Sequence, residues 1–282
     1  MRLSHYETEL TDSEGNVIRR PLELLVRQDE HHIAGKRLGR HLEHDPMSKL
    51  FPVDMSDRLD TASFASVLWE RECDAFDQGE LGSCTGNAMV GLLMTYPFAE
   101  VTRSIVGRDL TENDCIEIYK LATHLDRIPG EFPPDDTGST GLAVAKAVKE
   151  MGLIGVYRHA FTMRAALKAL QSGPVLTGFN WYDSFDEPDN HATVRVNPDS
   201  VVRGGHEVYA YGVTVEHTSS GDIDEENSYV HLWNSWGKEY GNNGRFNMTI
   251  STWRYLMKEH GDITVPTLRI PAPDAVETEP RI

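Results

Sequence analysis

Twelve residues in the first third of the chain constrain its fold and chemistry most strongly. Residues 77–88 read Asp-Gln-Gly-Glu-Leu-Gly-Ser-Cys-Thr-Gly-Asn-Ala. Apolar residues then recur at helical spacing, at Ala88, Met89, Leu92, Leu93 and Tyr96. The pattern predicts a helix that starts at Cys84 and presents its thiol at the N-terminus. The unpaired N–H groups and the dipole of a helix N-terminus favour the thiolate, which is the nucleophilic form of cysteine.

A thiolate nucleophile needs a base, and the base needs a group that orients it. His206 follows Gly204-Gly205 at the start of an apolar, aromatic run that predicts a strand, and Asn234 stands in Asn-Ser-Trp-Gly. They follow Cys84 by 122 and 150 residues. Gln78 precedes Cys84 by six residues, a reach at which its amide N–H can stabilise an oxyanion. We therefore expect Cys84, His206, Asn234 and Gln78 to form a catalytic site.

These motifs resemble the papain family of cysteine peptidases. The resemblance rests on Gln-Gly-x-x-Gly-Ser-Cys, Gly-His, and Asn-Ser-Trp-Gly with a Gly-x-x-Gly-x-Phe tail, in the order and at about the spacing of that family. It covers roughly residues 60–265. The sequence departs from the family pattern at Thr85 and Gly86, where a Trp often follows the nucleophile, and at Glu207, where a small residue often follows the His.

The resemblance implies an α+β, papain-like fold with the active-site cleft between a helical half and an antiparallel, β-barrel-like half. The peptidase domain would cover residues 56–270, with the helical half at about 75–172 and the sheet half at about 173–270. The cleft would bind substrate through Gly138, Ser139, Gly205 and Trp236, and Trp236 would shield the bond between His206 and Asn234. Ser139 is equally well explained as part of a helix-capping loop.

Residues 1–55 form a polar N-terminal extension, in which Asp12–Asn16 predicts the turn of a small hairpin and residues 37–46 an extended segment. It fits a structural appendage, a short prosegment or an arm that docks a partner. Residues 271–282 are rich in Pro and Glu and are expected to be a flexible tail.

Net charge and cysteine content limit the kinds of binding partner and the cellular compartment that we expect for this chain. A net charge of −17 argues against nucleic acid, and no apolar run is long enough to span a membrane. No metal-binding pattern is present, so we expect neither metal nor other cofactor. Cys73 and Cys115 could pair, although Cys115 lies on an apolar helix face. Secreted papain relatives usually have a cysteine at the position of Leu81; its absence and the lack of a signal peptide favour a cytoplasmic or virion-associated protein.

The residues predict a cysteine peptidase that acts on a polypeptide or peptide. Two alternatives remain open. The same site could perform amidase or transpeptidase chemistry on a non-protein or cell-wall peptide, because only the acyl acceptor differs. The chain could also be a catalytically silent binding module that retains the fold. The oligomeric state is not indicated.

Overall fold

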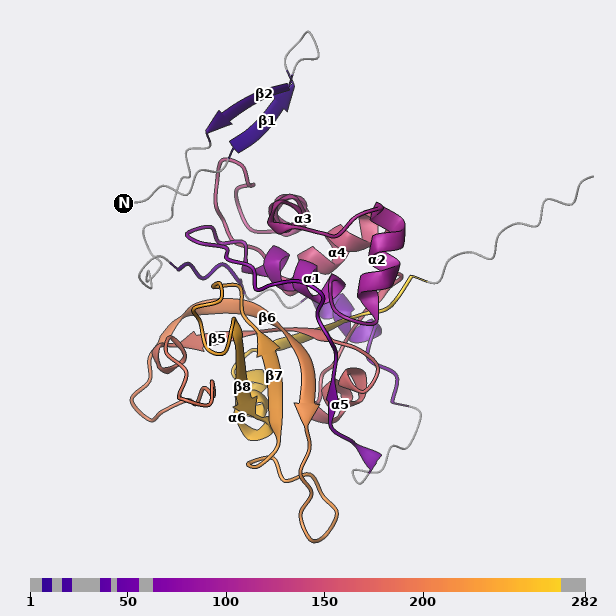
Figure 1. Ribbon diagram of the computed structural model, residues 1–282, viewed down its shortest axis with the longest axis vertical. Coiled ribbons are helices and arrows are strands. Elements are labelled where there is room, and N and C mark those ends of the chain that lie inside the picture. Colours follow the sequence, from indigo (N-terminus) through magenta and orange to yellow (C-terminus); the bar gives the residue numbers. More distant parts are fainter. Residues whose placement is uncertain (1–6, 12–16, 22–35, 42–44, 56–62, 270–282) are drawn as a thin grey trace, which may run out of the picture.

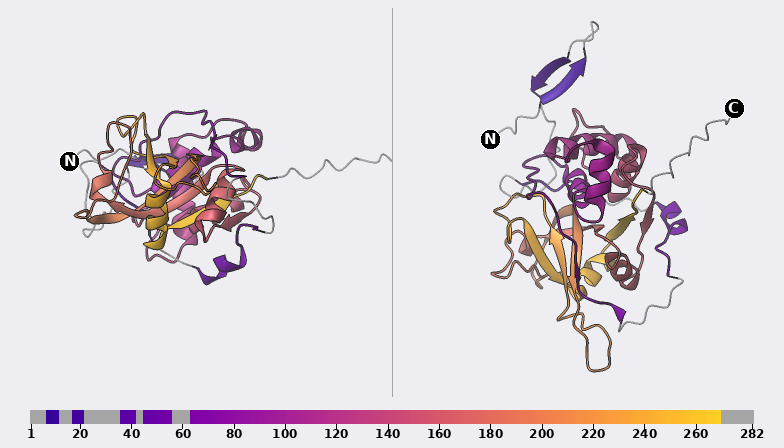
Figure 2. Two further views of the ribbon diagram at one scale, coloured as in Figure 1. Left: turned by 90° about the horizontal axis from the view of Figure 1, so that it is seen from below. Right: turned by 45° about the vertical axis from the view of Figure 1, so that its right-hand side comes forward.

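The computed structural model describes residues 7–11, 17–21, 36–41, 45–55 and 63–269. Helices α1–α4 gather on one side of the molecule and a twisted sheet on the other, as Figure 1 and the right-hand view of Figure 2 show. The helices are α1 (Cys84–Leu93), α2 (Phe98–Val106), α3 (Glu112–Leu125), α4 (Gly141–Glu150), α5 (Met163–Leu170) and α6 (Ile250–Lys258), with the 3-10 helices η1 (Pro46–Leu50) and η3 (Asp183–Phe185). The strands are β1 (Glu7–Thr11), β2 (Val17–Pro21), β3 (Val67–Leu68), β4 (Tyr157–His159), β5 (Val175–Tyr182), β6 (Val202–Thr214), β7 (Tyr229–Trp233), β8 (Arg245–Thr249) and β9 (Asp262–Pro266).

Helix α1 is the centre of the helical half, and all ten of its residues are buried. Two glycines allow its neighbours to approach closely. A Cβ at Gly86 would lie 2.2 Å from the backbone oxygen of Cys115 in α3, and a Cβ at Gly91 would lie 2.6 Å from the ring of Tyr209 in β6. Glycine lowers helix propensity by about 1 kcal/mol relative to Ala. Here it permits α1 to pack between α3 and the sheet.

The sheet half is built on one antiparallel sheet in the order β4-β9-β5-β6-β7-β8, with β3 paired to β6. Its core contains Phe179 and Trp181 of β5, Phe246 of β8 and Trp253 of α6. Helix α5 contributes to this core as well. The boundary expected near residue 172 would assign α5 to the helical half, but its apolar side packs on the sheet.

The α+β, papain-like class predicted from the sequence is confirmed. Helix α3 starts after Thr111 with a capping box, and α5 starts after Thr162, as their N-cap signals indicate. Two apolar residues that continue a helical spacing, Tyr96 and Met151, are exposed. Helix α1 ends at Leu93, so Tyr96 lies beyond it and is half exposed, and Met151, at the C-cap of α4, is also exposed.

In the N-terminal extension, β1 and β2 pair antiparallel, which is the expected small hairpin. Its turn at residues 12–16 and the tail at 271–282 lie outside the described residues.

Candidate active site

Cys84 is the first residue of α1 and is completely buried. Its thiol lies against two backbone N–H groups, one from Glu207 in β6 and one from Gly39 in the N-terminal extension. Burial raises the pKa of Cys84 to about 12, although these two N–H groups oppose the shift. The thiol is therefore neutral in this covered arrangement, in contrast to the thiolate expected at a helix N-terminus.

His206 lies in β6 directly before Glu207, whose backbone N–H lies against the Cys84 thiol. The Nε2 atom of His206 is 2.8 Å from Oδ1 of Asn234, the residue after β7. Because Oδ1 also accepts the Ser235 N–H at 2.7 Å, it is the acceptor, and Nε2 carries the hydrogen. In the neutral ring this leaves a lone pair on Nδ1, a buried atom without a hydrogen-bond partner in the described structure.

Two tryptophans hold the imidazole in place. The Trp181 ring meets His206 edge-on with centroids 4.8 Å apart, and the Trp236 centroid lies 5.0 Å from it. Both tryptophans are buried, and burial lowers the pKa of His206 to about 4. Trp236 was expected beside the His206–Asn234 bond from the resemblance. Nothing local in the sequence relates Trp181 to a histidine 25 positions away, so sequence reasoning did not identify it as a site residue.

Gln78 points its amide nitrogen toward the N-terminal extension. Its Nε2 donates to the backbone oxygens of Arg37 at 3.0 Å and Leu81 at 2.8 Å. Its Oε1 accepts the Ser235 hydroxyl at 2.5 Å, which fixes the amide orientation. The amide predicted to stabilise an oxyanion thus donates to two peptide carbonyls, and one of them, that of Arg37, belongs to the N-terminal extension.

Residues 36–41, here called the cleft segment, run in extended form between the two halves. Ser139 N–H donates to Gly39 and His41 N–H donates to the Ser139 oxygen, both at 2.8 Å, which makes a parallel bridge centred on Arg40. Arg40 N–H donates to the Gly205 oxygen at 3.1 Å, and Lys36 Nζ donates to the Trp236 oxygen at 2.8 Å. The cleft segment therefore contacts three of the four residues that the sequence assigns to substrate binding.

The fourth, Gly138, is in contact with the same segment and has a φ of +72°. A Cβ at this position would lie 2.3 Å from the Gly39 oxygen, and a Cβ at Gly205 would lie 2.3 Å from the Arg40 oxygen. Both glycines are required for so close a backbone approach. Ser139 directly precedes Thr140, the N-cap of α4, so it belongs to the helix-capping loop and also pairs with the cleft segment through its backbone.

Each basic side chain in the cleft segment before His41 meets a carboxylate of the domain. Lys36 pairs with Asp77 at 3.2 Å on the surface, whereas Arg37 pairs with the fully buried Asp136. Asp136 also accepts the Tyr119 hydroxyl at 2.6 Å and the Gly82 N–H at 2.9 Å. Arg40 lies between Glu207, at 3.6 Å, and Asp262.

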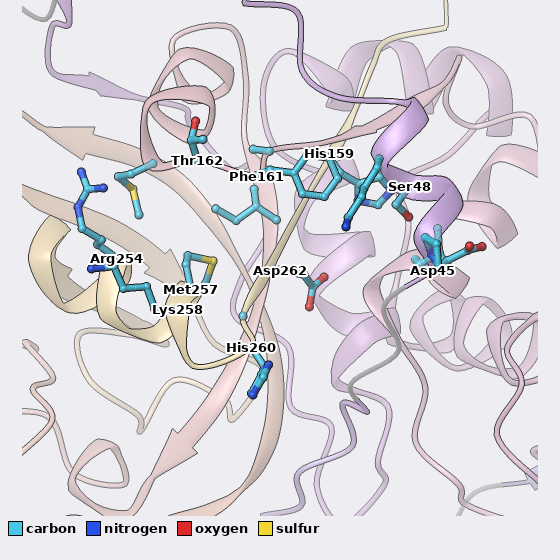
Figure 3. Close-up of a pocket in the computed structure, with 17 residues that line it drawn as sticks. Asp45, Ser48, His159, Phe161, Thr162, Arg254, Met257, Lys258, His260 and Asp262 are labelled. Carbon is cyan, nitrogen blue, oxygen red and sulfur yellow. The ribbon is translucent and has the colours of Figure 1, made fainter.

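A cavity of about 630 Å³ lies beside this cleft, between η1, the N-terminus of α5 and the residues that follow α6. Figure 3 shows the Asp262 carboxylate pointing into it between His260 and Ser48. The cavity does not reach Cys84. Asp262 is shared between this cavity and the Arg40 ion pair.

The remaining chemistry-bearing residues are unremarkable. All three cysteines are free, so Cys73 and Cys115 do not pair here, and Cys115 is buried in the helical core. Among the described residues, no three His, Cys, Asp or Glu side chains are grouped so as to hold a metal ion. The described part of the chain also contains no helix long and apolar enough to cross a membrane.

Comparison with known proteins supports the fold assignment. No family model matches the chain. An uncharacterized peptidase C1-like protein of Acanthamoeba polyphaga mimivirus is 27% identical over 226 residues, which span 65% of this chain and 66% of that relative, just under two thirds of it. Xylellain, a cysteine protease from Xylella fastidiosa, superposes with a TM-score of 0.54 at 19% identity, covering 87% of this chain and 100% of xylellain. Digestive procathepsin L2 from Tenebrio molitor gives a TM-score of 0.53 at 18% identity, covering 82% of this chain and 78% of that chain. These matches confirm the resemblance to papain-like cysteine proteases, and the fold of this chain is papain-like.

Proposed function

We propose that this protein is a cysteine-type peptidase that hydrolyses peptide bonds through Cys84, His206, Asn234 and Gln78. The observation that carries the proposal is the buried His206–Asn234 hydrogen bond, which leaves the Nδ1 lone pair of His206 as a proton acceptor, together with the Cys84 thiol against the backbone of Glu207, the next residue. The likeness to peptidases and the extended segment paired in the cleft support it.

The residues define the roles. Nδ1 of His206 takes the Cys84 proton, and the sulfur attacks the substrate carbonyl carbon. The oxyanion accepts hydrogen bonds from the Cys84 N–H and from Nε2 of Gln78. His206 then gives its proton to the leaving amine, the C–N bond breaks, and an acyl thioester remains on Cys84. Water, deprotonated by His206, attacks the thioester and releases the carboxylic acid and the thiol. Asn234 keeps the imidazole oriented throughout.

Catalysis by this route requires the cleft segment to move. The segment accepts a hydrogen bond from the Gln78 amide and contacts the Cys84 thiol, so a substrate carbonyl cannot reach either group. Water that enters when the segment leaves would reduce the desolvation that holds both Cys84 and His206 neutral. The thiolate–imidazolium pair would then form in the open state. Of the three explanations for the N-terminal extension, this arrangement favours a short prosegment.

The direct test is cleavage of an unstructured protein by the full-length chain and by three variants. Cys84→Ala should abolish turnover. Gln78→Ala should reduce kcat by about 10²–10³-fold, the usual effect of losing one oxyanion donor. Gln171→Ala, whose side chain bonds only the Ala65 backbone within the described residues, is the matched control and should retain activity.

The same assay separates the alternatives. Products in which an added amine replaces water on the new carboxyl end would indicate transpeptidase chemistry. Absence of any cleavage, together with an unreactive but reduced Cys84, would favour a silent binding module.

A further inference from the structure

We propose that Glu207 and Asp262 form an acidic subsite that binds an arginine or lysine side chain of the substrate, and that Arg40 occupies this subsite in the present structure. The inference rests on the proposed peptidase function and adds a substrate class to it. It makes Glu207, which follows the candidate base His206 directly, a specificity-determining residue.

The occupant is an arginine held on several sides. Arg40 is 5% exposed. Its guanidinium bonds the Asp262 carboxylate, donates to the His260 oxygen at 3.2 Å, and lies with Nε 3.6 Å from Glu207. Two carboxylates and a carbonyl acceptor surround the guanidinium and balance its charge, while its buried Nε has no hydrogen-bond partner among the described residues. The site therefore matches a long basic side chain in charge, and Asp262 and the His260 oxygen accept hydrogen bonds from it.

Two glycines border this pocket and leave space for such a side chain. A Cβ at Gly178 in β5 would lie 2.2 Å from Nε of Arg40 and 2.4 Å from Glu207. A Cβ at Gly141, the first residue of α4, would lie 2.7 Å from Glu207 and 3.1 Å from Asp262. Any larger residue at either position would fill the pocket.

Apart from Arg40, no group in the described structure balances the charge of the Glu207 carboxylate by an ion pair or a hydrogen bond. Its side chain is fully buried, and neither carboxyl oxygen has a hydrogen-bond partner there. An isolated buried carboxylate is strongly unfavourable unless a cation pairs with it. Burial, with the nearby Asp262, raises the pKa of Glu207, and Arg40 opposes that shift. When the cleft segment leaves, this carboxyl group needs either a proton or a new cation.

Backbone pairing places a substrate side chain in the same position. Arg40 is the residue opposite Ser139 in the bridge, and its side chain enters the pocket from there. An extended peptide that pairs with the Ser139 backbone would likewise direct its opposing side chain toward Glu207. Backbone bonds of this kind accept any sequence, so the pocket supplies the selectivity.

The first test is a cleavage profile of a peptide library by the full-length protein. We expect Arg and Lys to be enriched at one fixed position relative to the cut bond. Glu207→Gln keeps the shape but removes the charge, and should lower the ratio of kcat/KM for Arg against Leu at that position by about tenfold or more. Asp199→Asn, an exposed loop residue with the same charge change, should leave the ratio unchanged.

A second test does not depend on activity. In Arg40→Ala, ethylguanidinium should refill the vacated pocket and raise the Tm by about 2 °C or more, beyond the effect of equal sodium chloride. Wild type, whose pocket is filled, and Arg40→Ala/Glu207→Gln, whose pocket is less acidic, should not respond. If Arg40→Ala does not fold, Arg40→Lys is used in its place. Ethylguanidinium should then raise the Tm by a smaller amount, because it must displace the lysine side chain from the pocket.

The outcomes separate the two proposals. Cleavage without a basic preference, or with a preference that Glu207→Gln leaves intact, overturns the subsite and leaves the peptidase standing. No cleavage, with ethylguanidinium still bound, overturns the peptidase and retains the cation site. No cleavage and no ethylguanidinium response overturn both.

Discussion

Replacing Arg37 by Ala should open the cleft far more than replacing its neighbour Lys36. The Arg37–Asp136 ion pair is buried on both sides, with 2% and 0% of the side chains exposed, whereas Lys36 and Asp77 are 26% and 49% exposed. Breaking a buried pair costs about 3–5 kcal/mol, and an exposed pair contributes about 0–1 kcal/mol.

These energies set the expected rates. Asp136 keeps its bonds from Tyr119 and Gly82 in the variant, so we take the lower end, about 3 kcal/mol, for Arg37→Ala. Each 1.36 kcal/mol is a factor of ten, so the open population should rise by about 10²-fold. Lys36→Ala should raise it by at most about fivefold.

Alkylation by iodoacetamide, followed by peptide mapping, reports this population. Cys84 reacts only when uncovered, whereas Cys115 is buried in the helical core away from the segment and reports global unfolding. We expect Cys84 to react about 10²-fold faster in Arg37→Ala, with Cys115 unchanged. Equal Cys84 rates in both variants, or parallel acceleration of Cys115, would refute the argument that the buried pair holds the segment in place.

Three further predictions follow from the site and the core. Burial lowers the pKa of His206 from 6.5 to about 4, so the unfolded chain binds more protons than the folded chain between these pH values. His206 should therefore leave the free energy of unfolding unchanged above pH 6.5 and reduce it by about 3 kcal/mol as the pH falls to 4. In His206→Gln the urea midpoint should depend less on pH over this range. Asn234→Ala should lower kcat/KM by about 10²-fold with near-ultraviolet circular dichroism unchanged, because the imidazole loses the acceptor that orients it. Gly86→Ala should cost about 1–3 kcal/mol in urea unfolding, since the added methyl overlaps the Cys115 carbonyl; a cost near zero would mean that α1 and α3 separate easily.

Local signals in the sequence were sufficient to predict much of this architecture. The glycines and Cys84 before an apolar run marked α1, and Thr111 and Thr162 marked the starts of α3 and α5. Of the four candidate catalytic residues, His206 bonds Asn234 directly, Gln78 bonds Ser235, the residue after Asn234, and the Cys84 thiol lies against the N–H of Glu207, the residue after His206. Their order and spacing could indicate this because the motifs resemble those of a known family.

The course of the cleft segment could not be predicted in the same way. Residues 36–41 have no strand alternation, and their partners Ser139 and Gly205 lie about 100 and 165 positions away in the chain. Backbone pairing between residues so far apart in the sequence is determined by the folded cleft, and the sequence of the segment itself does not reveal it. The unusual Glu207 was visible in the sequence, but its meaning depends on Arg40, which only the tertiary structure places beside it. The exposed Met151 shows the converse, since an apolar residue at helical spacing can lie past the last packed turn.

The central claim is that Cys84 is a nucleophile activated by His206. Its most direct measurement is mass mapping of the full-length protein and of Arg37→Ala after treatment with an epoxide-type cysteine-protease inactivator. We predict modification at Cys84 in both proteins, faster in Arg37→Ala and lost when His206→Ala is added. A folded Arg37→Ala protein with reduced Cys84 and no modification there would contradict the account.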